Sequence, residues 1–119
     1  MKILIVDDNA VMRQTIRSIV AAPDDVTAEC EDGSSVISCY ESFHPDWVLM
    51  DLKMSRTNGI AATRQLKQSH PEARIAILTN YGDQEFRDEA HSAGAERYFM
   101  KDNLPEIRQQ LLQSRSSSV

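Results

Sequence analysis

Near the start of the chain, residues 3–8 read Ile3-Leu4-Ile5-Val6-Asp7-Asp8, four apolar residues followed at once by two acids. A second run of the same kind, Trp47-Val48-Leu49-Met50-Asp51, also ends in an acid. Short apolar runs separated by helical patterns are typical of the buried strands of a parallel sheet. The carboxyl ends of such strands form one rim of the sheet, where ligands bind. The sequence therefore predicts that Asp7, Asp8 and Asp51 meet at this rim.

Three carboxylates at one rim repel one another. A pair of unit charges 4 Å apart costs about 4 kcal/mol at an effective dielectric of 20. A divalent cation bound by carboxylate oxygens is the simplest way to offset this repulsion. We therefore expect a Mg²⁺ site in which Asp8 and Asp51 each donate an oxygen, while Asp7 holds a metal-bound water.

The composition narrows the class of protein. The chain has 119 residues, 41% of them hydrophobic and 26% charged, which predicts one globular domain. A net charge of −5 argues against contact with a nucleic-acid backbone. No apolar stretch approaches the ~20 residues of a membrane span, and the start of the chain lacks the pattern of a signal peptide. Cys30 and Cys39 lack the spacing of metal ligands, so we expect reduced thiols in a cytoplasmic protein.

The remaining pattern alternates strand and helix five times. The first helix has Met12, Ile16, Ile19 and Val20 on one face, and Gly94 closes the fourth. The strands are expected at residues 2–7, 26–30, 46–51, 74–79 and 97–100, and the helices at 10–21, 36–43, 59–68, 83–93 and 104–112. Five such units with short loops predict a single doubly wound, flavodoxin-like α/β domain with a five-stranded parallel sheet. The strand order 2-1-3-4-5 is favoured, because the weakly alternating second strand suits an edge.

This topology brings further polar side chains to the same rim. Thr79 ends the fourth strand and Lys101 follows the fifth. Three acids, a hydroxyl and an ammonium suit phosphoryl transfer, which requires an aligned attack and neutralisation of charge on the moving oxygens. Carboxylates can form acyl phosphates, and Asp51 is the best-placed nucleophile. Lys101 and Thr79 would contact two phosphoryl oxygens.

On these residues the chain resembles the receiver domains of bacterial two-component response regulators over residues 2–113. The matching stretches are Ile3-Leu4-Ile5-Val6-Asp7-Asp8, Val48-Leu49-Met50-Asp51-Leu52-Lys53-Met54, Asn58-Gly59, Ile77-Leu78-Thr79, Ala93-Gly94-Ala95 and Tyr98-Phe99-Met100-Lys101. The resemblance implies that Asp51 accepts a phosphoryl group from a sensor histidine kinase or a histidine phosphotransfer protein. It also implies a Mg²⁺ site made by Asp8, Asp51 and the Lys53 backbone carbonyl, with Asp7 acting through water.

The resemblance extends to the output of the signal. Thr79, Lys101 and Tyr98 match the switch and phosphate-binding positions of the family. Phosphorylation would reshape the face formed by the fourth helix, fifth strand and fifth helix, through which relatives often form homodimers. The Thr79-Asn80-Tyr81 and Lys101-Asp102 stretches are most similar to the branch with LuxR-type DNA-binding output domains. DNA binding and transcription control would then belong to a domain beyond residues 1–113, for which the Ser-rich segment 114–119 would be a tail or the start of a linker.

Three positions depart from the family pattern and could tune reaction rates. Ser55 replaces a common Pro and would leave its loop less rigid, and Asn80 replaces a small residue and would narrow access to the phosphoryl group. The Lys53 side chain could lean over the site and slow the attack of water on the acyl phosphate.

Other functions fit the sequence less well. A Mg²⁺-dependent phosphatase with an aspartyl nucleophile would need a second acid where Lys53 stands. A flavodoxin-type cofactor site would need a Ser-, Thr- and Gly-rich loop where the chain has Asp8-Asn9-Ala10. A receiver-like interaction module that is not phosphorylated, or a stand-alone regulator, remains the alternative. The chain is expected to be a signalling protein rather than an enzyme, catalysing only its own phosphorylation and dephosphorylation.

Overall fold

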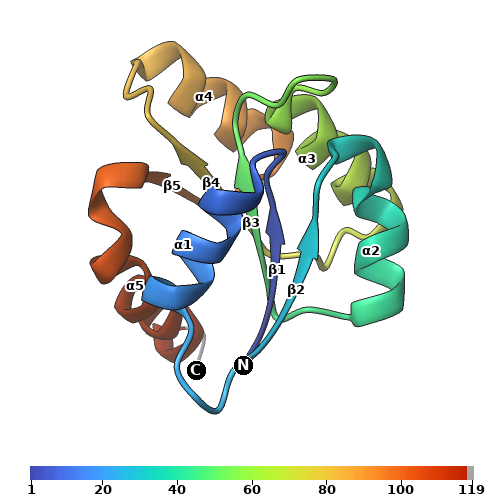
Figure 1. Ribbon diagram of the computed structural model, residues 1–119. Coiled ribbons are helices and arrows are strands. Elements are labelled where there is room, and N and C mark those ends of the chain that lie inside the picture. Colours follow the sequence, from blue (N-terminus) through green and yellow to red (C-terminus); the bar gives the residue numbers. More distant parts are fainter. Residues whose placement is uncertain (118–119) are drawn as a thin grey trace.

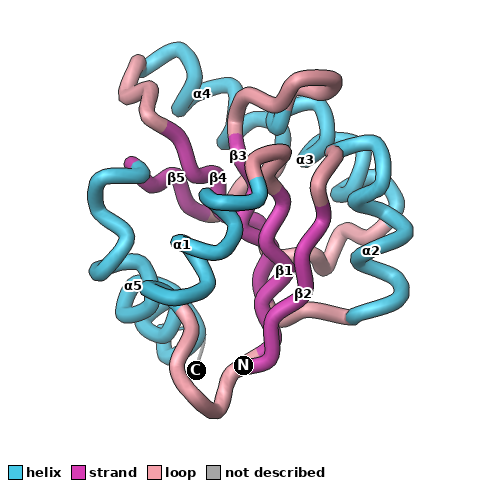
Figure 2. The backbone as a smooth tube through the Cα atoms, viewed as in Figure 1, coloured by secondary structure: helices cyan, strands magenta, loops and turns pink. Residues whose placement is uncertain are grey.

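The computed structural model describes residues 1–117, with side chains described for residues 1–113. It contains one five-stranded parallel sheet in the order β2-β1-β3-β4-β5, as the sequence predicted. Figures 1 and 2 show this sheet between two layers of helices. In chain order the elements are β1 (Lys2–Val6), α1 (Ala10–Val20), β2 (Val26–Cys30), α2 (Val36–Phe43), β3 (Trp47–Asp51), α3 (Gly59–Ser69), β4 (Ile75–Thr79), α4 (Gln84–Ala93), β5 (Arg97–Met100) and α5 (Leu104–Ser117).

The three central strands, β1, β3 and β4, bury both of their faces, which is why they are continuous apolar runs. Alternate residues point to opposite sides of the sheet. Leu4 and Val6 pack on the side of α2, α3 and α4, whereas Ile3 and Ile5 pack on the side of α1 and α5. Each buried aliphatic side chain contributes about 1.5–3 kcal/mol. These two cores hold the sheet together, so the polar rim at its carboxyl end need not contribute to stability.

Local signals set where several helices begin and end. The side chains of Asn9 and Asn58 accept hydrogen bonds from backbone N–H groups in the first turns of α1 and α3. Gly94 closes α4 with a φ of 109°, in the left-handed region that favours glycine, and His44 closes α2 with a φ of 53°.

Element boundaries differ from the predicted ones by a few residues. Asp7 lies just past β1, and α5 continues through Ser117, into the segment 114–119 predicted as a tail or linker. Residues 118 and 119 of that segment lie outside the described residues, and the predicted domain boundary at 113 stays a prediction. Within residues 1–117, none of the helices has the length and apolar content required to cross a membrane.

Candidate functional site

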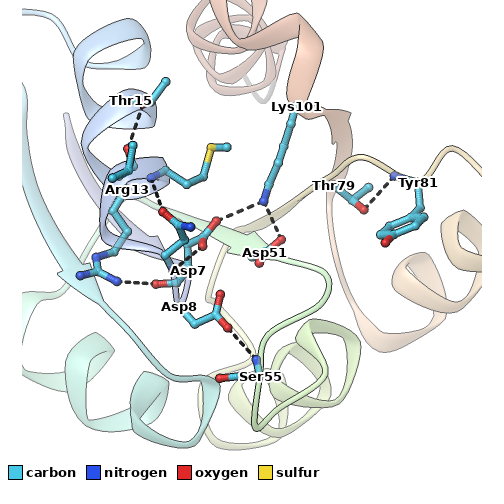
Figure 3. A network of polar contacts seen from close by, with 12 residues as sticks. Asp7, Asp8, Arg13, Thr15, Asp51, Ser55, Thr79, Tyr81 and Lys101 are labelled. Atoms are coloured by element: carbon cyan, nitrogen blue, oxygen red, sulfur yellow. Dashed lines mark hydrogen bonds and ion pairs between the residues drawn. The ribbon is translucent and has the colours of Figure 1, made fainter.

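Three carboxylates converge at the carboxyl end of the sheet, as the sequence predicted. Asp7 and Asp8 follow β1, and Asp51 ends the neighbouring strand β3. One carboxylate oxygen from each residue lies within 4.8 Å of the other two. Asp7 and Asp51 are buried, with 1% and 7% of their surfaces exposed, whereas Asp8 is exposed. The cluster therefore has a buried inner part and one exposed acid. Figure 3 shows the three side chains together at the ends of their strands.

Lys101 binds the buried part of this cluster. The residue follows β5, and its Nζ lies 2.9 Å from Asp51 Oδ1 and 3.2 Å from Asp7 Oδ2. Its aliphatic chain extends from the end of β5, at the edge of the sheet, and places the ammonium between the two carboxylates (Figure 3). An ammonium in this position is available to pair with negative oxygens that arrive at Asp51.

Charge at the site is unbalanced, and the pKa values reflect this. Burial raises the pKa of Asp51; the hydrogen bond from Lys101 opposes this effect, and the negative charge of Asp7 adds to it. Burial alone would lower the pKa of Lys101, but the hydrogen bond and charge of Asp51 and the charge of Asp7 outweigh it and raise that pKa. The raised pKa of Asp51 comes first from burial and then from the charge of Asp7, whereas the raised pKa of Lys101 comes from the two carboxylates that it contacts. The site would accept additional positive charge.

Contacts that the sequence did not predict hold the first two acids in place. The Arg13 side chain on α1 donates to the Asp7 backbone carbonyl at 2.7 Å and also pairs with Glu29 of β2. The Ser55 N–H, in the loop after β3, donates to Asp8 Oδ2 at 2.7 Å. A proline at position 55 would lack this donor. Ser55 therefore ties its own loop to an acid of the site.

The backbone around Asp51 is closely packed against the start of α3. The Gly59 N–H donates to the Leu52 carbonyl at 2.7 Å. A Cβ added at Gly59 would lie 2.0 Å from the Asp51 carbonyl oxygen. Glycine is required here because of this close approach.

Thr79 and Tyr98, the predicted switch residues, are connected through Tyr81. Thr79 is buried at the end of β4, and its Oγ1 accepts a hydrogen bond from the Tyr81 N–H at 3.0 Å. The hydroxyl of Tyr98, half-buried on β5, donates to the Tyr81 carbonyl at 2.5 Å. In the sheet, Tyr98 lies beside Ile77, and Met100 lies beside Thr79. Tyr98 therefore reaches the loop after β4 through the length of its side chain.

The three predicted rate-tuning residues lie at the exposed rim of the site. Ser55 contacts Asp8 as described, and Asn80 lies in the loop after β4. The Lys53 ammonium is 4.2 Å from the centre of the Tyr81 ring and 5.5 Å from that of Phe86. Lys53 therefore contacts both the loop after β4 and the start of α4 through cation–π contacts.

The donor set fits a hard divalent cation. Carboxylate oxygens are the ligands that Mg²⁺ prefers, and one or two carboxylates with waters are its usual protein site. Asp8 and Asp51 could supply these oxygens. The excess of negative charge around Asp51 fits the same ion.

The fold and the site together define a signalling type of α/β domain, with an acid cluster and a lysine at the switch point of a doubly wound sheet. The chain belongs to the response regulator receiver domain family, which it matches over residues 3–112. It is thus the receiver domain of a response regulator, as its sequence predicted.

Individual relatives agree with this assignment. The chain is 42% identical over 108 residues to the uncharacterized transcriptional regulatory protein YhcZ of Bacillus subtilis, a match that covers 89% of this chain and 50% of that protein. It is 38% identical to the chemotaxis protein CheY of Bacillus subtilis, covering 84% of each. A LuxR-family response regulator from Aurantimonas superposes with a TM-score of 0.90 at 30% identity, covering 98% of this chain and 85% of that one. The chain spans about half the length of the transcriptional regulators that it matches.

Proposed function

We propose that Asp51 accepts a phosphoryl group from a phosphohistidine on a sensor histidine kinase or a histidine phosphotransfer protein. The observation that carries this proposal is the contact of Asp51 Oδ1 with the Lys101 ammonium at 2.9 Å, inside a cluster of three acids. A buried carboxylate held against an ammonium and facing two further acids has what an in-line phosphoryl transfer requires.

In this reaction an Asp51 carboxylate oxygen attacks phosphorus. The new O–P bond forms while the P–N bond of the phosphohistidine breaks, and the imidazole keeps the electron pair of that bond. Lys101 stays at the site and exchanges part of its contact with the carboxylates for a phosphoryl oxygen. Its raised pKa keeps it protonated for this role.

The residues suited to hold Mg²⁺ are Asp8, Asp51 and the Lys53 backbone carbonyl, with Asp7 acting through a water. When bound, the ion neutralises charge on the phosphoryl oxygens. Asp7 supports this arrangement from a fixed position, because its N–H donates to the Cys30 carbonyl and its own carbonyl accepts from Arg13.

Phosphorylation would be read through the chain Thr79–Tyr81–Tyr98. A phosphoryl group adds negative charge and acceptor oxygens near Thr79, whose hydroxyl would turn toward them and weaken its bond with the Tyr81 N–H. The loop would then shift, and with it the carbonyl that holds the Tyr98 hydroxyl. The face formed by α4, β5 and α5 changes shape, which alters binding to a partner or a second copy of this chain. If partner binding by Tyr98→Ala responds to phosphorylation as in wild type, this role is wrong.

Lys53, Asn80 and Ser55 are proposed to set the rates of the reaction. Lys53 lies above the Tyr81 and Phe86 rings, and from there its side chain would screen one side of the approach to Asp51. Loss of its ammonium in Lys53→Met should open this side and speed loss of the phosphoryl group to water. The measurement is the decay of the phosphorylated species by intact mass; a decay equal to that of wild type would remove Lys53 from this role.

The output is proposed to be transcription control by a DNA-binding domain outside this chain. The similarity to YhcZ and to a LuxR-family regulator supports this proposal. The receiver itself would not contact nucleic acid, in keeping with its net charge of −5.

The experiment that tests the proposed function is intact-mass analysis after incubation with Mg²⁺ and phosphoramidate. Wild type should gain one phosphoryl group, whereas Asp51→Asn, and wild type with the Mg²⁺ removed by chelation, should gain none. Asp102→Asn is a matched control, because Asp102 is an exposed acid next to Lys101 that lies outside the acid cluster. A wild-type protein that gains no phosphoryl group would favour a module that signals by binding alone.

A further inference from the structure

The two cysteines lie together between β2 and α2. Cys30 is the last residue of β2 and is 3% exposed, and Cys39 is half-buried on α2, which packs beside β2 (Figure 1). Both are free thiols. They line one cavity of about 310 Å³, together with Arg13, Glu29, Glu31 and Ser35. Cys39 also lines a neighbouring cavity of about 400 Å³.

The two thiols are close enough to influence each other. Burial raises the pKa of Cys30 to about 12, and a hydrogen bond with the Cys39 thiol adds to this effect. Cys30 therefore stays protonated, and its thiol donates to the Asp32 carbonyl at 3.2 Å. Cys39 is the more exposed of the two and is the thiol that a small solute meets first.

The residues around this cavity also hold Asp7. The Asp7 N–H donates to the Cys30 carbonyl at 3.0 Å. The Asp7 carbonyl accepts from Arg13 (Figure 3), and Arg13 also lines this cavity. Both polar groups of the Asp7 peptide backbone are thus bound by residues of the cavity. A change in the position of Cys30 would be transmitted directly to an acid of the phosphorylation site.

We propose that Cys30 and Cys39 form an intramolecular disulfide on exposure to a peroxide, and that this bond weakens Mg²⁺ binding by displacing Asp7. The second part rests on the proposed function, because it needs the acid cluster to be the Mg²⁺ site. The shared cavity and the backbone contacts of Asp7 carry the inference.

The chemistry balances with hydrogen peroxide as the oxidant. The Cys39 sulfur attacks one peroxide oxygen; an S–O bond forms, the O–O bond breaks, and one water leaves after proton transfer, giving a sulfenic acid. The Cys30 thiol then attacks the Cys39 sulfur and passes its proton to the departing hydroxyl; the S–S bond forms, the S–O bond breaks, and a second water leaves. Two thiols lose two electrons in total, and peroxide is reduced to two waters.

The disulfide would change the contacts of Cys30. Its sulfur would turn toward α2 and could no longer donate to the Asp32 carbonyl. The Asp32 side chain accepts from the hydroxyl of Thr57, which lies in the loop after β3. Oxidation would therefore disturb the site from two directions, through Asp7 and through this loop.

The test compares wild type with Cys39→Ser and Cys30→Ser before and after hydrogen peroxide. Intact mass of the oxidised wild type should fall by two hydrogen atoms, and dithiothreitol should reverse the change. Titration calorimetry with Mg²⁺ should show affinity weakened roughly tenfold, the lower end of what loss of a supporting contact costs a metal site. In both serine variants peroxide should leave Mg²⁺ affinity unchanged.

Any other result would refute one of the two parts of this proposal. No loss of hydrogen, gain of oxygen alone, or a dimer linked between chains would refute the intramolecular disulfide. A disulfide with unchanged Mg²⁺ affinity would refute the coupling to Asp7. Failure of the proposed function is recognised separately, because the reduced wild type would then gain no phosphoryl group from phosphoramidate with Mg²⁺ present.

Discussion

Replacing Gly59 by alanine tests how closely the backbone at the site is packed. The added Cβ would lie 2.0 Å from the Asp51 carbonyl oxygen and 2.9 Å from its carbonyl carbon. Contacts of a real Cβ essentially never fall below 3.0 Å, so α3 and the end of β3 must separate by about 1 Å. Neither group is a flexible side chain that could move aside. The displacement therefore falls on the residue proposed as the nucleophile.

The expected effects are on rate and on stability. A misplacement of about 1 Å costs roughly 100-fold in a reaction that depends on alignment. Overpacking of this kind costs about 1–3 kcal/mol of unfolding free energy. The assays are the initial rate of phosphoryl gain from phosphoramidate at saturating Mg²⁺, and unfolding in urea.

Gly82→Ala is the matched control for this substitution. A Cβ at Gly82 would meet only the Met100 side chain, at 3.5 Å or more, which is an ordinary contact. This variant should keep the wild-type rate and stability. If Gly59→Ala also keeps both, the close approach does not position Asp51, and the reasoning is refuted.

Three further predictions concern single side chains. Lys101→Met should fold but lose about 100-fold or more in phosphorylation rate, because the charge on the phosphoryl oxygens loses its ammonium partner; phosphoramidate kinetics check this. Tyr98→Phe should accept phosphate normally but lose about 1 kcal/mol of stability, because the Tyr81 carbonyl loses its donor; urea unfolding beside the mass assay measures both. Burial alone would raise the pKa of Asp25, but hydrogen bonds from a backbone N–H, the terminal amine and Arg108 outweigh burial and lower this pKa below 3.8. A carboxylate with a lowered pKa stabilises the fold above pH 3.8, and this stabilisation is lost as the pH falls further. Asp25→Asn should therefore cost about 1–3 kcal/mol of unfolding free energy at pH 7. The urea unfolding curves of wild type and Asp25→Asn should converge in acid.

Much of the fold could be predicted because parallel strands are buried on both faces. The runs at Ile3–Val6 and Trp47–Met50 have no polar residue to suggest another role, and their order follows from the weak edge character of residues 26–30. The sequence predicted the buried faces of the helices less accurately. Ile19 was predicted on the buried face of α1, yet it is 43% exposed. In a short helix the apolar pattern is wider than the stripe that the sheet covers.

The arrangement of Asp7, Asp8 and Asp51 could be predicted because strand ends share one rim. The contacts that hold them could not. Periodicity does not fix the conformation of a loop, so nothing indicated that the Ser55 N–H would reach Asp8. Likewise, nothing in the sequence indicated that the Lys53 ammonium would lie over the Tyr81 and Phe86 rings. Such contacts depend on how separate segments meet in three dimensions.

The central claim is that Asp51, rather than a neighbouring acid, carries the phosphoryl group. Borohydride reduces an aspartyl phosphate to homoserine, so the modified residue can be located by peptide mass analysis after reaction with phosphoramidate and Mg²⁺. The account predicts homoserine at position 51, with Asp7 and Asp8 unchanged. Homoserine at position 7 or 8, or phosphate retained on a serine or histidine, would contradict it.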